Sequence, residues 1–465
     1  MIPPRARPIL DRVQPLADAF AAAGHRLYLV GGIVRDLVAD PTSGADPSPD
    51  FDLTTDARPA EVKAIVGPIA EALWTQGERF GTIGARIEDT QIEITTHRAE
   101  VYRSDSRKPD VEFSTDIETD LSRRDFTINA MAIEVTSAEP TLIDPFGGID
   151  DLLAKVLRTP LSPDISFSDD PLRMLRAARF IARFDLRAAP EMADAVAAMS
   201  ERLDIVSPER IRDELCKLVM VEDPSAGLWF VYEGGLADVF FPELPAMRLE
   251  QDPIHRHKDV LAHTIAVVAK SHRQLEVRLA ALFHDVAKPK TRSIGPKGVS
   301  FHHHEVVGAR MTRDRMRTLR FSNDLVESVS TLVYLHLRFH TYEMGWSDSA
   351  VRRFVRDAGD LLPELLWLTR ADCTTRNKRK AEALDRRIDD LEAQIAELRE
   401  REELAAIRPD LDGGEIMDHL GITPGPVVGD ALAHLLEIRL DEGPLDHDEA
   451  LRRLDAWWAT RDLPS

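Results

Sequence analysis

A short apolar run that ends on two glycines, Leu27–Val30 followed by Gly31 and Gly32, constrains the fold of this chain more than any other feature. Such a run predicts a strand, and the glycines predict a turn that opens a helix. The bare backbone N–H groups at the start of that helix attract phosphate. Arg35 would add a guanidinium to hold the same phosphate. The alternative is a plain strand, turn and helix without a ligand.

Two aspartates, Asp50 and Asp52, lie in the next strand-like run. Residues i and i+2 of an extended segment line one face, so both carboxylates point to the same side. Two like charges this close repel each other, and a divalent metal removes the conflict. Oxygen ligands suit magnesium, and a pair of metals can hold the attacking and the leaving oxygen of a phosphoryl transfer. Taken alone, such a pair is also common in solvated turns.

Further motifs follow in a fixed order at Arg123–Met131, Ile143–Gly148 and Asp169–Phe180. Together with Leu29–Thr55 they resemble the class II nucleotidyltransferases of the DNA polymerase beta superfamily, the group that holds bacterial CCA-adding enzymes and poly(A) polymerases. The resemblance covers residues 27 to about 220. With Arg370–Asn377 and Arg408–Gly413 added, the pattern of the whole chain is most similar to the actinobacterial CCA-adding members.

The resemblance implies roles for individual residues. Asp50 and Asp52 would be the catalytic pair that binds Mg²⁺. Glu93, on the polar face of an alternating strand, is a candidate third carboxylate and equally a surface residue. Asp40–Pro49 is longer than in the common family pattern, which a loop tolerates. The expected nucleotide-binding residues are Gly31, Gly32, Arg35, Arg124, Asp125, Asn129, Asp170, Arg173, Arg176 and Arg179.

Asp170, Arg173, Arg176 and Arg179 stand three apart and line up along a helix. A basic helix face is the plainest interpretation. Beside a nucleotide site, however, a carboxylate accepts from an exocyclic amine and a guanidinium donates to ring acceptors. Cytosine and adenine present an amine beside an unprotonated ring nitrogen, whereas uracil and guanine present a carbonyl beside N–H. In the resembled family the residues matching Asp170 and Arg173 read the base in this way.

The implied reaction is template-independent addition of C, C and A to the 3' end of tRNA. The terminal 3'-hydroxyl, activated by metal at Asp50 and Asp52, attacks the α-phosphorus of CTP or ATP in line and releases pyrophosphate. Catalysis of this kind depends mainly on positioning and charge stabilisation. The partners expected are therefore the tRNA 3' end, CTP and ATP.

Histidines concentrate between about residue 250 and residue 340. Imidazole and carboxylate groups suit nickel, manganese, iron or zinc. The arrangement resembles the HD phosphohydrolase superfamily, which places His263, His284, Asp285 and Asp372 in its four principal metal-binding positions. His304 and His336 would fit a two-metal version. Such a domain either hydrolyses phosphoesters or serves structurally.

The fold class expected is therefore α+β: a polymerase-beta-like nucleotidyltransferase palm, then an all-α neck, an HD domain and a helical tail. We expect the head at 1–155, a neck that binds nucleobase and RNA at 156–250, the HD domain at 251–375 and an acidic C-terminal segment at 376–465. Within the last, leucines and isoleucines from Leu384 to Leu398 alternate spacings of four and three. This pattern is too short for a coiled coil and predicts a helix packed inside its own chain.

Charge and cysteine content restrict the setting. The net charge is -21, which by itself argues against a nucleic-acid ligand. However, residues 388–465 hold 7 Lys/Arg and 20 Asp/Glu, so the acidity belongs mostly to the tail and RNA would approach elsewhere. Cys216 and Cys373 are the only cysteines, which excludes a disulfide framework and agrees with a cytoplasmic location. The sequence contains no apolar run long enough for a membrane span.

Three alternatives remain open at this point. One is a poly(A) polymerase of the same family, which uses the same palm and base-reading residues. Another is a metal-dependent phosphohydrolase whose N-terminal half binds RNA. A non-catalytic RNA-binding protein is least favoured, because both metal-binding constellations would then have no use. The sequence does not determine the oligomeric state.

Overall fold

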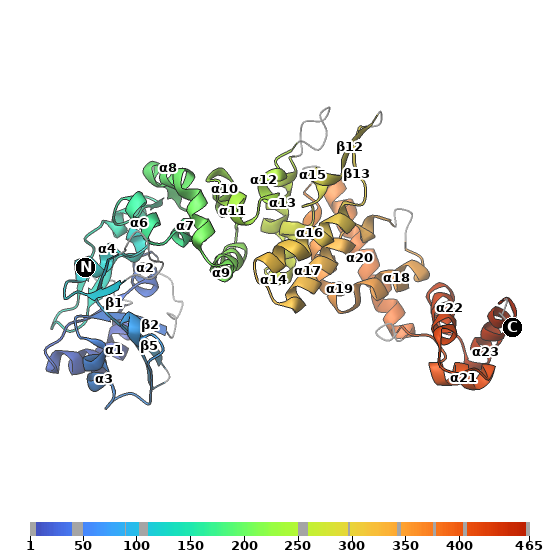
Figure 1. The fold of residues 1–465 in the computed structure, drawn as a ribbon, viewed down its shortest axis with the longest axis horizontal. Helices are drawn as coiled ribbons and strands as arrows, with labels where there is room; N and C mark the ends of the chain where they lie inside the picture. The colour runs from blue at the N-terminus through green and yellow to red at the C-terminus, as the bar shows by residue number, and fades with distance from the viewer. Residues whose placement is uncertain are drawn as a thin grey trace. The chain divides into compact units, whose positions relative to one another are not determined.

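The computed structural model describes residues 6–39, 50–88, 90–101, 110–249, 259–295, 298–341, 346–374, 378–402 and 407–461. The inserted segment Asp40–Pro49 lies outside these residues. The chain forms two compact units, Met1–Pro242 and Glu243–Ser465, and each is described by itself (Figure 1).

A mixed seven-stranded sheet forms the base of the first unit. β2 and β5 run parallel, and the other neighbouring strands of this sheet are antiparallel. In spatial order the strands are β3 (Ala72–Trp74), β4 (Thr82–Ile87), β5 (Thr90–Thr96), β2 (Asp50–Thr55), β1 (Leu27–Val30), β8 (Ala132–Glu134) and β9 (Thr141–Ile143).

The position of β1 inside the sheet explains why its sequence is apolar without interruption. All four of its residues are buried. Leu27 and Leu29 enter the larger core on one face, and Tyr28 and Val30 enter a smaller core on the other. Since successive side chains point to opposite faces, a strand covered on both sides has to be apolar throughout.

Helices cover the larger core of the sheet. α1 buries Ile9, Val13, Leu16, Ala17 and Phe20, an apolar stripe at helical spacing. The helices of this part are α1 (Arg7–Ala22), α2 (Gly32–Ala39), α3 (Pro59–Val66), α4 (Ile117–Ser122) and α5 (Gly148–Leu153). A separate antiparallel pair joins β6 (Arg98–Val101) to β7 (Asp110–Phe113).

A cluster of short helices completes the first unit, with α7 packed against α9 and α10. Most residues of α7 are buried, among them Leu175, Ala178 and Phe180. A two-residue parallel pair joins β10 (Val156–Leu157) to β11 (Arg187–Ala188). The helices are α6 (Pro163–Asp169), α7 (Leu172–Phe184), α8 (Pro190–Met199), α9 (Pro208–Val219), α10 (Ser225–Glu233) and α11 (Leu236–Phe240).

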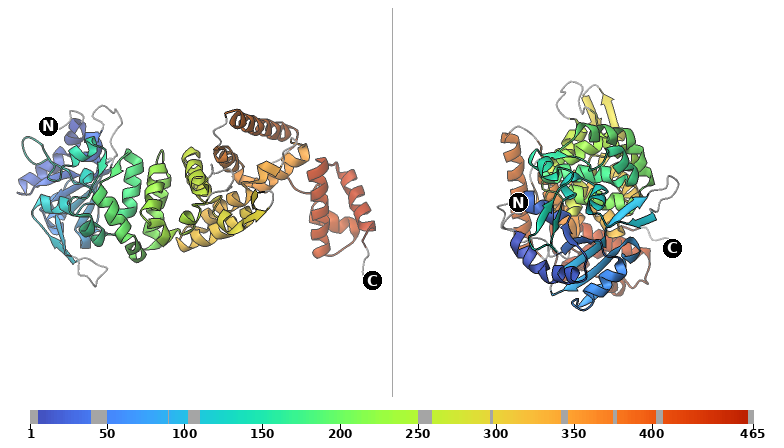
Figure 2. Two further views of the ribbon diagram at one scale, coloured as in Figure 1. Left: turned by 90° about the horizontal axis from the view of Figure 1, so that it is seen from above. Right: turned by 90° about the vertical axis from the view of Figure 1, so that its left-hand side faces the viewer.

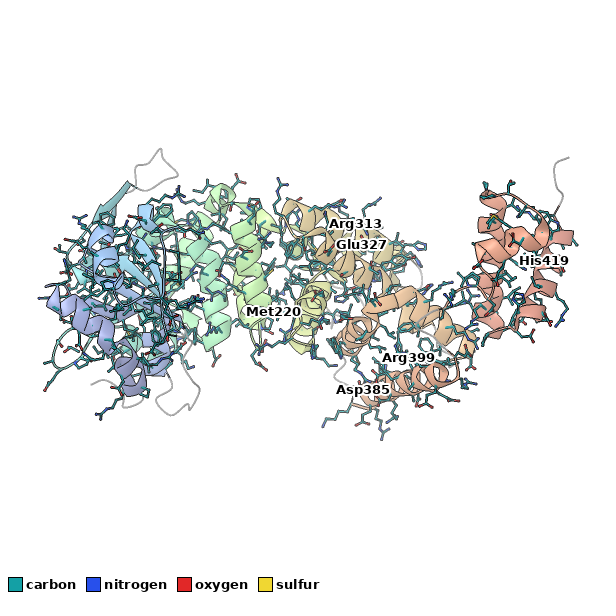
Figure 3. The ribbon with its side chains drawn as sticks, turned by 90° about the horizontal axis from the view of Figure 1, so that it is seen from below. Met220, Arg313, Glu327, Asp385, Arg399 and His419 are labelled. Atoms are coloured by element: carbon teal, nitrogen blue, oxygen red, sulfur yellow. The ribbon has the colours of Figure 1, made fainter. Side chains whose placement is uncertain are left out.

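Helices dominate the second unit, and α14 packs against α13, α17 and α19 near its centre. Arg313 of α16 lies beside Glu327 of α17, with Nη2 3.4 Å from Oε2 (Figure 3). The elements of this part are α12 (Glu243–Ala246), α13 (Val260–Lys270), α14 (Leu275–Phe283), α15 (Lys288–Thr291), the antiparallel pair β12 (Arg292–Gly295) and β13 (Gly298–Phe301), α16 (His304–Thr318), α17 (Asn323–Leu335), α18 (Asp348–Ala358) and α19 (Leu362–Asp372).

The seam expected near the C-terminal end lies on α20 (Lys378–Arg401), which packs against α18 and α19 of its own chain (Figure 2). Four of its residues are buried there, Ile388, Leu391, Ile395 and Leu398. Three last helices, α21 (Gly413–Leu420), α22 (Pro426–Glu442) and α23 (His447–Ala459), enclose a core of their own. Arg352 of α18 ties this part to the rest through Glu402 and the carbonyl of Leu440.

The predicted α+β class is confirmed, with one large sheet before residue 150 and helices after it. The short strand pairs β10–β11 and β12–β13 were not predicted, because two to four residues carry no periodic signal. In the part of the chain that the structure describes, no helix is both long and apolar enough to cross a membrane.

The close packing of α10 on α7 can be tested by substitution of a glycine. A Cβ added at Gly227 would overlap the carbonyl oxygen of Ala178 and lie 2.5 Å from Leu218 Cδ1. Gly227→Ala should therefore destabilise the protein by about 1–3 kcal/mol, measured by chemical denaturation. The control is Gly429→Ala in α22, where a Cβ meets nothing within 4 Å and the substitution should stabilise by about 0.5–1 kcal/mol. Equal effects of the two substitutions would contradict the packing argument.

Candidate active site

A cavity of about 540 Å³ opens in the first unit where the sheet meets the helices that follow it. The β1–α2 turn, the exposed face of β2 and β5, the segment after α4, and α7 and α9 all contribute to its wall. Its positive charge comes from arginines: Arg35, Arg98, Arg123, Arg124, Arg173, Arg176, Arg179, Arg183 and Arg210. A wall of this composition suits a ligand that carries several negative charges.

The glycine turn forms one edge of the cavity. Gly31 has φ +76°, the left-handed region that glycine adopts without strain. A Cβ at this position would lie 3.3 Å from Asp52 Oδ2 and 3.7 Å from Arg124 Nη1. The backbone therefore approaches both groups closely, and α2 begins at Gly32.

Carboxylates form another edge of the cavity. Phe51 and Leu53 of β2 enter the larger core, so the alternating residues Asp50 and Asp52 belong to the other face. The parallel register pairs Asp52 with Glu93 of β5, and both side chains line the cavity. The backbone of Asp50 starts β2, while its side chain lies outside the described residues.

A buried carboxylate behind the wall holds two of the arginines. Asp120 is fully buried and accepts from Arg123 Nη2 at 3.0 Å and from Arg124 Nη2 at 3.2 Å. Burial alone would raise the pKa of Asp120, but the two guanidinium charges outweigh burial and lower the pKa to about 2. Asp120 is therefore ionised at neutral pH and positions both arginines.

Two more carboxylates hold the arginines of α7. Asp125 accepts from Arg176 Nη2 at 2.6 Å and from Asn129 Nδ2 at 2.9 Å. Despite burial, which acts in the opposite direction, these contacts lower the pKa of Asp125. Glu214 of α9 accepts from Arg179 Nε at 2.7 Å.

Arg35 lies in the wall but is largely buried. Its Nη1 donates to Asn129 Oδ1 at 2.7 Å and its Nε donates to Asp36 at 2.8 Å. The guanidinium also stacks over Phe184, 4.4 Å from the ring centroid. Arg35 is thus fixed by protein contacts, whereas the sequence suggested a side chain reaching out to phosphate.

The expected base-reading pair meets at the junction of α6 and α7. Arg173 is buried, donates from Nη1 to Ser166 Oγ at 2.9 Å and donates from Nη2 to the carbonyl of Arg123. Asp170 Oδ1 accepts from the N–H of Leu172 at 3.1 Å, and its Oδ2 accepts from Arg210 Nη2 at 2.7 Å. Both residues line the cavity.

The structure thus brings together, around one cavity, most of the head and neck residues that the sequence singled out. These are Gly31, Gly32, Arg35, Asp52, Glu93, Arg124, Asp125, Asn129, Asp170, Arg173, Arg176 and Arg179. Sequence reasoning missed Asp120, Arg210 and Glu214. Glu214 and Arg210 lie in the helix that begins at Pro208. The mixture of acidic and basic residues in this helix was the signal that could have pointed to them.

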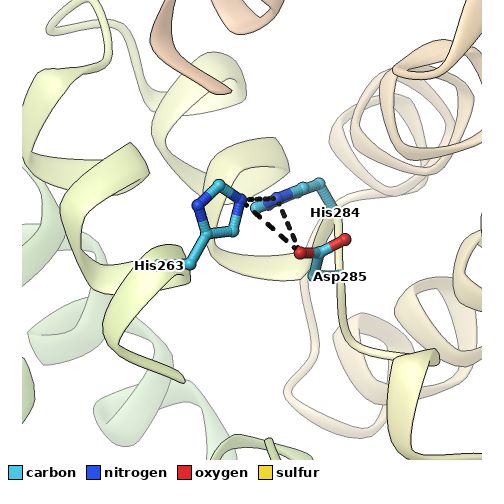
Figure 4. A group of neighbouring side chains, drawn as sticks. All are labelled: His263, His284 and Asp285. Atoms are coloured by element: carbon cyan, nitrogen blue, oxygen red, sulfur yellow. Dashed lines mark hydrogen bonds and ion pairs between the residues drawn. The ribbon is translucent and has the colours of Figure 1, made fainter. Parts of the chain in front are cut away.

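The second unit contains a separate cluster of histidines and carboxylates. His263 of α13 meets His284 and Asp285 at the end of α14 (Figure 4). His263 Nε2 lies 3.3 Å from His284 Nε2, and His284 Nε2 lies 3.2 Å from Asp285 Oδ2. Asp372, the last residue of α19, places Oδ1 3.0 Å from His263 Nε2. The four residues that the sequence assigned to the HD positions therefore meet.

Two further histidines extend this cluster on the other side of Asp285. The ligand atoms of Asp285, His304 and His336 lie within 4.8 Å of one another, as do those of His263, His284 and Asp285. Asp285 belongs to both groups. The arrangement offers two adjacent sets of ligands that share one carboxylate, which is the geometry that a pair of metal ions requires.

Hydrogen bonds fix the tautomers in this cluster. Nδ1 of His284, His304 and His336 lies 2.8, 2.8 and 2.6 Å from the carbonyl oxygens of Ala281, Phe301 and Val333. A carbonyl only accepts, so Nδ1 carries a proton in each of these rings, and Nε2 points into the cluster. Nε2 of His304 and of His336 is buried without a hydrogen-bond partner among the described residues. Burial and the neighbouring His284 lower the pKa of His336 to about 3, so the ring is neutral, as a metal ligand has to be.

Known protein families match three parts of the chain. The poly(A) polymerase head domain matches residues 27–158, the probable RNA- and SrmB-binding site of polymerase A matches 185–247, and the HD domain matches 260–403. The first match contains Asp52 and Glu93, and the third contains the histidine cluster.

Relatives match over most of the chain. An A-adding tRNA nucleotidyltransferase of Deinococcus radiodurans is 32% identical, over 88% of this chain and 91% of its own. A CCA-adding enzyme of Enterococcus faecalis is 28% identical, over 94% of this chain and 92% of its own. The crystal structure of the Bacillus stearothermophilus CCA-adding enzyme in complex with CTP shares the fold, with a TM-score of 0.70, 22% identity and 99% of both chains covered.

The depressed pKa of Asp120 generates a prediction about stability. Asp120→Asn should lower the free energy of unfolding of the first unit by about 2 kcal/mol at pH 7. Because the pKa is depressed from 3.8 to about 2 on folding, this stabilisation is present above pH 3.8 and is lost as pH falls toward 2. Chemical denaturation, monitored by hydrogen exchange of the β1 and β2 amides and repeated from pH 7 to pH 2, measures this loss of stability.

The matched control is Glu118→Gln, an exposed position on the same helix, which should change stability by less than about 0.5 kcal/mol. A wild-type advantage over Asp120→Asn that stays constant between pH 7 and pH 2 would contradict the ion-pair account.

Proposed function

The chain belongs to the family of tRNA nucleotidyltransferases and poly(A) polymerases, and from this premise we propose that it adds C, C and A to the 3' end of tRNA, using CTP and ATP without a template. The observation that carries the proposal is a single cavity that combines a carboxylate edge, a dense arginine wall and the Asp170–Arg173 pair. The E. faecalis relative is a CCA-adding enzyme and that of D. radiodurans adds A. From these substrates, tRNA and nucleoside triphosphates, we infer a cytoplasmic location.

The carboxylate edge fits a divalent metal, and the nucleotidyltransferase head depends on one. Asp52 and Glu93 lie side by side in the parallel register, and oxygen donors in this number suit Mg²⁺. We assign Mg²⁺ binding to Asp50 and Asp52. When bound, the ion supplies positive charge at the reacting phosphate and lowers the pKa of the attacking hydroxyl.

The protein's own groups position the reactants. Arginines of the wall, held by Asp120, Asp125 and Glu214, balance the charge of the triphosphate. The N–H groups of the glycine turn add neutral donors. The 3'-oxygen of the RNA bonds to the α-phosphorus, the bond from that phosphorus to the β-phosphate oxygen breaks, and pyrophosphate leaves. The arginine wall stabilises the charge that develops on the leaving group.

Base selection falls to Asp170 and Arg173. The Asp170 carboxylate accepts from the exocyclic amine of cytosine or adenine and repels the carbonyl that uracil and guanine present at the same place. Arg173, rigidly held by Ser166 and the Arg123 carbonyl, donates to the ring acceptor of the base. Selection thus needs no nucleic-acid template.

Incubation with tRNA that lacks its 3' end, together with CTP and ATP, tests the function directly. We expect addition of C, C and A followed by arrest, resolved by sequencing gel. A long A tail would instead identify a poly(A) polymerase, and addition of only A or only C-C would identify a partial activity.

Replacement of Asp52 or Asp50 tests the proposed active site. Asp52→Ala or Asp50→Ala should reduce addition by at least about 10³-fold, because charge stabilisation at the reacting phosphate is lost. The folded structure should persist by circular dichroism. The control is Glu71→Ala, an exposed position before β3 that does not line the cavity, which should retain wild-type activity. Robust addition by Asp52→Ala would refute the assignment.

The histidine cluster favours a second activity, hydrolysis of phosphoesters in the second unit. The cluster fits one or two transition metal ions, Ni, Mn, Fe or Zn. Among the described residues, Nε2 of His304 and of His336 is buried without a hydrogen-bond partner, and the ligand atoms of both residues lie within 4.8 Å of that of Asp285. His263, His284, Asp285 and Asp372 would hold the first ion, and Asp285, His304 and His336 the second. Such ions, when bound, supply Lewis acidity toward a phosphate oxygen.

Metal analysis of the purified protein, paired with hydrolysis of p-nitrophenyl phosphate and bis-p-nitrophenyl phosphate, tests this second function. We expect one to two ions per chain and metal-stimulated hydrolysis, both lost in His284→Ala. His302→Ala, an exposed histidine nearby in the sequence, should leave both unchanged. Bound metal without hydrolysis would restrict the cluster to a structural role.

A further inference from the structure

The carboxylate of Asp170 is engaged at both oxygens. Oδ1 accepts from the N–H of Leu172 at 3.1 Å, which ties it to the first residue of α7. Oδ2 accepts from Arg210 Nη2 at 2.7 Å. The first contact belongs to the same loop as Asp170, whereas the second reaches across forty residues of sequence to the first turn of α9.

Arg210 differs from the other cations around Asp170. Its side chain is 53% exposed, yet it lines the cavity. Arg173, the nearest arginine on α7, is buried and tied to Ser166 and to a backbone carbonyl. Arg210 is therefore a cationic partner of Asp170 that a substitution can remove without disturbing the buried core.

The contact restricts what Asp170 can do. A carboxylate held at one oxygen by a charge-assisted hydrogen bond loses most of its freedom to rotate. Each carboxylate oxygen accepts more than one hydrogen bond, so Oδ2 can still accept from an amine while Arg210 stays in place. The group that accepts is thereby held in one orientation.

On this basis the geometry assigns Arg210 to the selection of the incoming base, as the positioning residue that holds Asp170 in its accepting orientation. The inference rests on the proposed nucleotide addition and deepens it. Without Arg210, the Asp170 carboxylate turns away, and the penalty on a uracil or guanine carbonyl at this position falls.

The test compares incorporation of CTP with UTP, and of ATP with GTP, on tRNA substrates that end before each addition. Arg210→Ala should lower both kcat/KM ratios by about tenfold, the effect of one charge-assisted hydrogen bond. The loss should come mainly from a higher KM for CTP and ATP. Arg210→Lys, which keeps the charge, should restore part of the selectivity.

The matched control is Arg212→Ala, two residues along the same helix. Arg212 pairs with Asp213 at 2.8 Å and is not among the cavity residues, so its removal should leave both ratios unchanged. Circular dichroism and the unfolding temperature of Arg210→Ala should match the wild type. If Arg210→Ala unfolds, Arg210→Gln replaces it.

A double-mutant cycle with Asp170→Ala decides whether Arg210 acts through Asp170. In the Asp170→Ala background, Arg210→Ala should change the ratios no further. An equal loss in both backgrounds, or unchanged selectivity in Arg210→Ala, would overturn the inference while leaving nucleotide addition intact. Failure of the wild-type protein to incorporate CTP or ATP would instead overturn the proposed function, and with it the premise of this inference.

Discussion

The crowding of guanidinium groups around one cavity is the constraint on which the first unit depends. Because like charges repel, the folded protein has to hold these arginines together before a phosphate binds and neutralises them. Three carboxylates offset the repulsion, Asp120 and Glu214 behind the wall and Asp125 within it. They come from α4, from the segment after it and from α9. Head and neck elements are thereby joined into one site. The arginines are oriented before the substrate binds, and catalysis by positioning depends on such prior orientation.

This constraint also explains why a chain with net charge -21 can use RNA and nucleotides as substrates. Most of the acidity lies after residue 387, in 7 Lys/Arg against 20 Asp/Glu. Many of those carboxylates pair locally, as Glu449 does with Arg452 and Arg453. The carboxylates near the cavity have a different part, because Asp120 and Asp125 are buried and point their charge at arginine. Net charge therefore says little about ligand sign when the opposite charges are separated within the fold.

The sequence was a good guide where function depends on neighbours along the chain. Gly31, Gly32 and Asp52 belong to one strand–turn–helix–strand unit, whose alternation and turn chemistry predict the shared edge. Arg210 escaped prediction because it pairs with Asp170 of a distant segment, and such pairing exists only after folding. Asp120 was missed although Arg123 and Arg124 follow it by three and four residues, because the sequence does not reveal that its carboxylate is buried. Arg35 lines the cavity beside the glycine turn, as its motif suggests, whereas its stacking on Phe184 depends on the packing of α7 and left no signal in the sequence.

The histidine cluster follows the same physical logic with different atoms. In the cavity, buried carboxylates orient arginines, whereas in the cluster backbone carbonyls orient imidazoles by accepting a hydrogen bond from Nδ1 of His284, His304 and His336. Both arrangements leave a charged or lone-pair-bearing atom facing inward with its rotation already restricted. The Nε2 atoms of His304 and His336, buried without a hydrogen-bond partner among the described residues, cost stability. A bound ion would offset that cost, which argues for metal binding before it argues for any particular hydrolysis.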